Sequence, residues 1–231
     1  MKKIIALAVM LVAGVAAFAD ESETNWEKSI GLSTGITFSN TKFTLDSASG
    51  DMKSKVGGLS VDFANADIRS VYKNNISVMA EFACGHLFAP TLDVDGTDMA
   101  AKLDGASGTH MNLFAGIGYR FKLSDRFSLT PSFVLGFDHT SVDGRQKDDD
   151  NQGISFNSME YSFGANVYSE FRLSEKWSLF FSATGTLNFM GTYRYEEYTE
   201  NKYDFTSTYQ KNDTGFGGFA VSPKIGVSFR Y

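Results

Sequence analysis

Cysteine and proline are nearly absent from this chain of 231 residues, which has one cysteine, Cys84, and three prolines. A single cysteine excludes an intramolecular disulfide framework, so packing and hydrogen bonds have to hold the fold together. Its position also excludes a lipoprotein, which would need a cysteine at the cleavage point of its leader peptide. No linker rich in proline or serine divides the chain, so we expect a single domain.

Basic residues are in deficit, because 21 lysines and arginines stand against 27 aspartates and glutamates, a net charge of -6. Such an acidic chain repels nucleic acid, and we expect no nucleic-acid partner.

Grouped metal ligands are also lacking, since His86, His110 and His139 are scattered without ligand spacing. The acidic stretches at 93–98 and 148–150 do not fit the calcium-loop pattern and are predicted to be solvated loops. We therefore expect no metal, no cofactor and no catalytic residues.

The N-terminus has the order of charges and apolar residues that is typical of an export signal. Lys2 and Lys3 precede an apolar stretch from Ile4 to Val15, and residues 17–19 form a small-x-small cleavage site. This order predicts a signal peptide over residues 1–19 and a mature domain over residues 20–231, with 19 basic and 27 acidic residues and a net charge of -8. A membrane anchor is the alternative, but a spanning helix needs about 20 apolar residues.

The mature sequence has no further apolar run long enough for a membrane helix, so any membrane span would have to consist of strands in a closed barrel. Segments that alternate apolar and polar residues are typical of such strands. Seven clear segments lie at 29–38, 76–82, 110–121, 127–137, 159–172, 177–189 and 221–231.

An eighth strand is expected between Leu59 and Tyr72, because a closed barrel with both termini on one side needs an even number. Leu59 and Phe63 share one face whereas Ile68 and Tyr72 share the other, which predicts a bulge that shifts the phase by one residue. Pro131 and Pro223 fall within two other predicted strands, where a bulge or an interruption would have to accommodate them.

The chain ends on an alternating strand with an aromatic last residue, in which Ile225, Val227, Phe229 and Tyr231 share one face. This ending resembles the insertion signal of bacterial outer-membrane barrels. A periplasmic β-sandwich is the alternative, but its exposed face would be more charged and its terminus would have no reason to be aromatic.

Connection lengths predict the orientation of the barrel. The sequence pattern of residues 121–129 recurs in residues 171–179, 50 positions later. Residues 72–76 lie at the equivalent position about one such interval before residue 121, so the sequence predicts three tight turns. Long connections are expected at 40–57, 87–108, 139–157 and 191–215, and their aromatic ends indicate strands that continue as ribbons. Short turns belong on the periplasmic side and long loops outside the cell.

Together these features resemble the small eight-stranded outer-membrane barrels, the group of OmpX, OmpW and the OmpA transmembrane domain. The resemblance implies an all-β, closed antiparallel eight-stranded transmembrane barrel in the outer membrane, with outer-membrane lipid and the barrel-assembly machinery as partners. Inside so narrow a barrel, opposite charges should pair and plug the lumen. The inward-facing charged residues are predicted to be Asp62, Glu81, Arg120, Glu160, Glu170, Arg172, Lys224 and Arg230.

Three functions are open at this point, since a fold does not choose among them. We expect first a non-enzymatic surface protein whose loops contact the environment or a host. A narrow, OmpW-like transporter for small or hydrophobic solutes is the second hypothesis. The third is an enzyme, because His139 and Ser141 resemble the base and nucleophile of outer-membrane lipid A deacylases. No acidic third member is identified, since the alternation places Glu160 on the opposite, inward face.

Overall fold

The computed structural model describes residues 25–45, 52–88, 90–147, 152–199, 202–213 and 217–231. The predicted signal peptide, residues 1–19, lies outside these ranges, as does the acidic stretch at 148–150. Within the described residues, no helix is long and apolar enough to cross a membrane.

Eight long strands make up most of the described chain, as the alternation predicts. They are β1 (Trp26–Leu45), β2 (Met52–Tyr72), β3 (Ile76–Leu87), β6 (Leu103–Tyr119), β8 (Phe127–Gln146), β9 (Gln152–Arg172), β10 (Trp177–Thr199) and β12 (Gly217–Arg230). The remaining elements are β4 (Thr91–Val94), β5 (Thr97–Asp98), the 3-10 turn η1 (Ala100–Lys102), β7 (Phe121–Lys122) and β11 (Lys202–Asp213), which pairs with β10 only.

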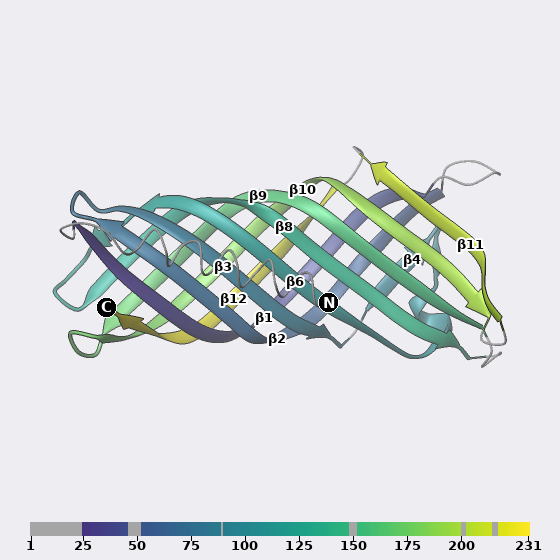
Figure 1. The fold of residues 1–231 in the computed structure, drawn as a ribbon, viewed down its shortest axis with the longest axis horizontal. Helices are drawn as coiled ribbons and strands as arrows, with labels where there is room; N and C mark the ends of the chain where they lie inside the picture. The colour runs from purple at the N-terminus through teal and green to yellow at the C-terminus, as the bar shows by residue number, and fades with distance from the viewer. Residues whose placement is uncertain (1–24, 46–51, 89, 148–151, 200–201, 214–216) are drawn as a thin grey trace.

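The eight long strands pair antiparallel in the order β1-β12-β10-β9-β8-β6-β3-β2, and β2 pairs again with β1. The sheet thus closes on itself as a barrel, which leaves no long strand without two neighbours. Figure 1 shows tight turns and the C-terminus at one end, here named the turn end, and β11 with the longer connections at the other, the loop end.

The predicted bulge in the second strand is confirmed. Pairing of β2 with β1 shifts between Ser33 and Gly35, and pairing with β3 shifts between Asp62 and Ala64. The extra residue reverses which β2 positions face inward, because side chains alternate with period two.

Neither expectation for the two prolines holds, because neither causes a bulge nor ends its strand. Pro131 pairs with Val167 of β9, and Pro223 pairs with Ala183 of β10. On its other side, each proline is not paired with the neighbouring strand, but the register is the same before and after this gap. β8 pairs at Ser132 with β6 and at Leu129 with β7, on either side of Pro131. β12 pairs with β1 at Lys224 and at Val221, on either side of Pro223. The backbone N–H that proline lacks is therefore missing only on the side where the neighbouring strand is unpaired.

The outer surface of the barrel is an apolar band. Its outward residues are large and highly exposed, among them Leu32 and Phe63, each 65% exposed. Aromatic residues border the band at both ends, with Trp26, Tyr72, Trp177 and Tyr231 at the turn end and Phe38, Phe163, Phe189 and Phe219 toward the loop end. Trp26 and Phe38 lie on one face of β1, about 40 Å apart along a strand that rises about 3.3 Å per residue. At a tilt of about 45°, the band is about 28 Å tall, the height of a bilayer core.

The strands continue beyond this band at the loop end, as the aromatic-rich sequence predicts. β8 and β9 remain paired up to Arg145 and Gly153, and β10 pairs with β11 from Gly191 onward. β9 and β10 also remain paired up to Gln152 and Thr199, so the expected long connections at 139–157 and 191–215 largely continue the sheet of the barrel wall rather than form loops.

Candidate functional site

The centre of the barrel holds an ion pair that spans the lumen. Lys224 on β12 contacts Glu81 on β3, and both side chains are fully buried. Thr184 donates a hydrogen bond to Glu81 Oε2 at 3.1 Å. Since two strands separate β3 from β12 around the barrel, the pair, here named the central pair, lies across the interior.

A second buried group lies beside the central pair. Arg69 donates a hydrogen bond to Asn166 at 2.9 Å, lies 3.6 Å from Asp67 and stacks over the Tyr168 ring at 3.8 Å from its centroid. Asn166 lies within 3.5 Å of Glu81, which joins the two groups. Alternation along β2 does not identify Asp67 and Arg69 as inward-facing, because the position of the bulge decides which way they point.

At the turn end, a single carboxylate is shared by three arginines. Glu27 Oε1 lies 2.8 Å from Arg120, 3.0 Å from Arg230 and 3.7 Å from Arg172. Arg230 also donates to Glu170 at 2.7 Å. These five residues are named the rim cluster. Arg172 does not lie inside the lumen as predicted. Its side chain is at the mouth of the barrel and is 39% exposed.

Two predicted lumen carboxylates have no cationic partner among the described residues. Asp62 accepts hydrogen bonds from Thr37 at 2.7 Å and Ser60 at 3.1 Å. Glu160 accepts from Ser158 at 2.6 Å, Asn188 at 2.9 Å and Thr41 at 3.0 Å. The expectation that inward charges pair with one another is therefore wrong at these positions, where hydroxyl and amide donors satisfy the buried oxygens instead.

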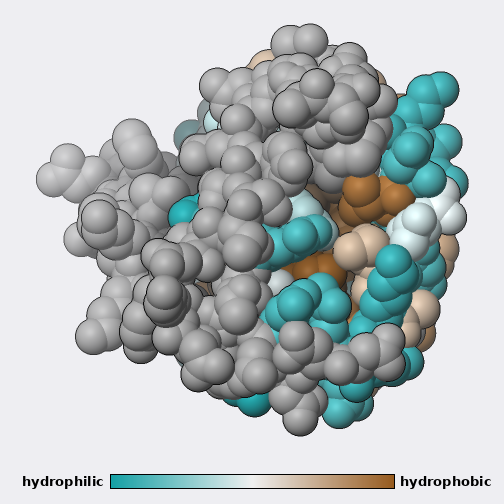
Figure 2. All heavy atoms as spheres, turned by 90° about the vertical axis from the view of Figure 1, so that its right-hand side faces the viewer, coloured by the Kyte–Doolittle hydropathy of each residue, from teal (hydrophilic) through white to brown (hydrophobic). Residues whose placement is uncertain are grey.

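The loop end of the interior is filled by apolar side chains, which differs from the polar, charged lumen that the sequence predicts. Phe43 packs on Phe156 and Tyr193 with ring centroids 5.1 and 5.0 Å apart, and Tyr193 donates a hydrogen bond to the Thr44 carbonyl at 2.9 Å. Figure 2, which views this end, shows apolar residues in brown between hydrophilic ones in teal. The group, here named the outer apolar cluster, comprises Phe43, Val56, Leu87, Leu92, Ala100, Leu103, Val142, Ile154, Phe156, Tyr193 and Tyr195.

A sequence signal for this cluster exists in the inward positions. Along β1 they run Thr37, Ser39, Thr41 and then Phe43, while the outward positions change from Phe38 to Asn40 and Lys42. The pattern reverses because the strands leave the apolar band, so that water surrounds them and the interior becomes the apolar side.

His139 and Ser141 do not form a base–nucleophile pair in this structure. His139 Nδ1 lies 2.6 Å from the Ser158 carbonyl oxygen, and the Ser141 hydroxyl donates to Asp143 at 3.0 Å. Within the described residues, no group of three or more histidine, cysteine, aspartate or glutamate side chains could hold a metal ion.

The four residues of the C-terminal motif lie on the outer surface at the turn end. Ile225 and Val227 are exposed on β12, and Phe229 packs edge-on against Trp177 with centroids 5.1 Å apart. Tyr231 follows β12, is 60% exposed and donates its N–H to the Lys28 carbonyl at 3.2 Å. The motif thus faces the apolar surroundings of the barrel and closes the seam with β1.

Two solved structures of outer-membrane proteins have a similar fold. A major outer membrane protein of Thermus thermophilus is 13% identical, with 86% of this chain and 99% of that chain covered and a TM-score of 0.58. The outer membrane protein OprG of Pseudomonas aeruginosa is 13% identical, with 89% and 96% covered and a TM-score of 0.56. No curated protein matches the sequence.

These similarities and the apolar band confirm the expected fold and the localisation to the outer membrane, with lipid around the barrel. Short turns of such barrels lie on the periplasmic side and long loops outside the cell, which predicts that the turn end is periplasmic and the loop end extracellular. A sequence model of the autotransporter β-domain matches residues 11–231. The chain belongs to the autotransporter β-domain family.

Proposed function

We propose that the protein is a non-enzymatic surface protein of the outer membrane, in which a closed barrel carries extracellular ribbons that contact the environment or a host. The observation that carries this proposal is the central pair, because Glu81 and Lys224 are both fully buried and meet across the lumen. An eight-stranded barrel leaves room for little besides its own side chains. The outer apolar cluster adds a second layer above the pair.

The proposal predicts that the barrel does not conduct. Purified protein in a planar lipid bilayer should give no steady unitary channels, because a solute would have to displace the buried central pair and then the outer apolar cluster. A porin added afterwards to the same bilayer verifies that channels would be detected. Steady channels from the wild type would overturn the closed-barrel proposal and favour a narrow transporter for small solutes.

The surface role also requires the ribbons to be reachable from outside the cell. Protease added to intact cells should cut within residues 143–152 and 193–214, and should spare the periplasmic turns at 124–125 and 174–175. Long polar segments cannot lie in hydrocarbon, so they have to project from the loop end. Cleavage confined to permeabilised cells would contradict both this topology and the contact function.

Assembly by the barrel-assembly machinery is part of the proposal. It is supported by the outward, lipid-facing position of Ile225, Val227, Phe229 and Tyr231 at the last strand.

A further inference from the structure

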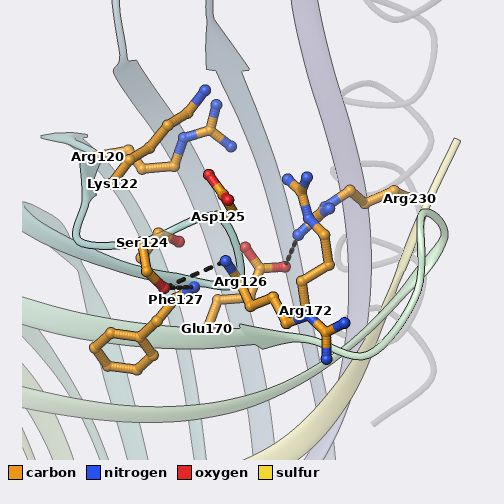
Figure 3. Close-up of a pocket in the computed structure, with 10 residues that line it drawn as sticks. Arg120, Lys122, Ser124, Asp125, Arg126, Phe127, Glu170, Arg172 and Arg230 are labelled. Atoms are coloured by element: carbon orange, nitrogen blue, oxygen red, sulfur yellow. Dashed lines mark hydrogen bonds and ion pairs between the residues drawn. The ribbon is translucent and has the colours of Figure 1, made fainter.

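A cavity of about 390 Å³ opens at the periplasmic mouth of the barrel, beside the rim cluster. Figure 3 shows the side chains that line it, which come from the residue between β6 and β7, from β7, from the turn before β8 and the start of β8, and from the ends of β9 and β12. Its volume falls in the range of small-molecule sites, about 300–1,000 Å³. Because the lumen above it is filled, the cavity is suited to binding rather than to passage.

The charge of the cavity is opposite to that of the chain. Among the described residues that line it, five are basic and only Asp125 and Glu170 are acidic. Counting Glu27 as well, which contacts three of the arginines, the cations still exceed the carboxylates by two. The chain as a whole has a net charge of -6, so this positive region is a local arrangement. The five basic residues are Arg120, Lys122, Arg126, Arg172 and Arg230.

The rim cluster leaves donors unused. Glu27 meets Arg120, Arg172 and Arg230 through the same oxygen, whereas each guanidinium has five N–H donors. Arg120 is only 7% exposed, and its buried Nε has no hydrogen-bond partner. Lys122 is exposed and forms no ion pair with a described residue. A buried donor without a partner costs free energy unless a ligand satisfies it.

We propose that this cavity binds a phosphate group. Guanidinium groups bind phosphate oxygens in bidentate geometry, and a doubly charged oxyanion would balance the excess of two cations. The polar and charged lining disfavours an apolar ligand. The phosphate could belong to a soluble periplasmic compound, whose monoester carries up to two negative charges, or to the headgroup of a lipid in the inner leaflet, whose diester carries a single charge; both present phosphate oxygens to the arginines.

The test is a calorimetric titration of sodium pyrophosphate into the full-length protein purified from outer membranes in a maltoside detergent at low salt. Binding should be saturable, and salt should weaken it because the interaction is between charges. Lys122→Gln removes one charged donor and should weaken binding about tenfold. Lys42→Gln removes a likewise exposed lysine at the other end of the barrel and should leave binding unchanged.

Arg120→Gln should abolish binding while the heat-modifiable band shows that the barrel is folded. Absence of saturable binding to the wild type, or equal affinities for the Lys122→Gln and Lys42→Gln variants, would overturn the proposal. Added phosphatidylglycerol distinguishes the two sources. If phosphatidylglycerol competes with pyrophosphate, and competes more weakly in the Lys122→Gln variant, the ligand is a lipid headgroup. If phosphatidylglycerol leaves pyrophosphate binding unchanged, the ligand is a soluble phosphate.

Discussion

Replacing Glu81 with glutamine is expected to lower the free energy of unfolding of the barrel by about 3–5 kcal/mol. The substitution keeps the shape of the side chain but leaves the Lys224 ammonium, which is fully buried, without the carboxylate that it contacts. Breaking a buried pair costs more than the pair contributes, because the remaining ion is still kept from water. Equilibrium urea unfolding of refolded protein, followed by the fluorescence of Trp26 and Trp177, measures the change.

Two further variants show whether the effect arises from the buried charge. Glu175→Gln makes the same change on an exposed carboxylate in the β9–β10 turn and should alter stability by no more than about 0.5 kcal/mol. Combining Glu81→Gln with Lys224→Met removes both charges and should recover most of the loss. If Glu81→Gln costs no more than Glu175→Gln, water screens the central pair, and the lumen is not closed at that level.

The strand order and closure follow from the sequence because alternation has period two and turn lengths fix antiparallel neighbours. The bulge in β2 could be predicted for the same reason, since Leu59 and Ile68 cannot share a face without it. Its exact place could not, because a shift anywhere between these residues reconciles the pattern.

The charge partners were less accessible from the sequence. The alternation of side chains along each strand indicates that Glu81 and Lys224 face inward. It does not say which side chains meet across the lumen, because the stagger of the eight tilted strands decides that. Arg69 and Asp67 face inward only because the bulge lies at residue 63, before them. Glu27 lies before the first residue of the predicted strand, so its role in the rim cluster depends on β1 starting at Trp26.

The outer apolar cluster shows a different limit. Periodicity separates the two faces of a strand but does not say which face is lined by lipid and which by water. The change from Thr41 to Phe43 on the inward face and from Phe38 to Asn40 on the outward face marks the height at which the barrel leaves the membrane. Once that height is known, the same alternation predicts a conventional apolar core above it.

Loss of the C-terminal motif is expected to remove most of the assembled protein from the outer membrane. In the Phe229→Ser, Tyr231→Ser variant, export should continue while the heat-modifiable band in the outer-membrane fraction falls strongly. The folded barrel itself should lose little stability, because the Phe229–Trp177 contact is one aromatic pair, worth about 0.5–1.5 kcal/mol. A large loss of assembly with a small loss of stability is the result expected of a recognition signal.

The matched control is Phe171→Ser, which removes another outward aromatic residue at the periplasmic end, 45% exposed on β9. Phe171 borders the same apolar band but lies on β9, two strands from β12, so it tests the aromatic border without the terminal strand. Assembly of this variant should stay close to that of the wild type. If Phe171→Ser reduces the heat-modifiable band as much as the terminal variant does, the loss reflects the aromatic border in general, and the last strand has no special part in assembly.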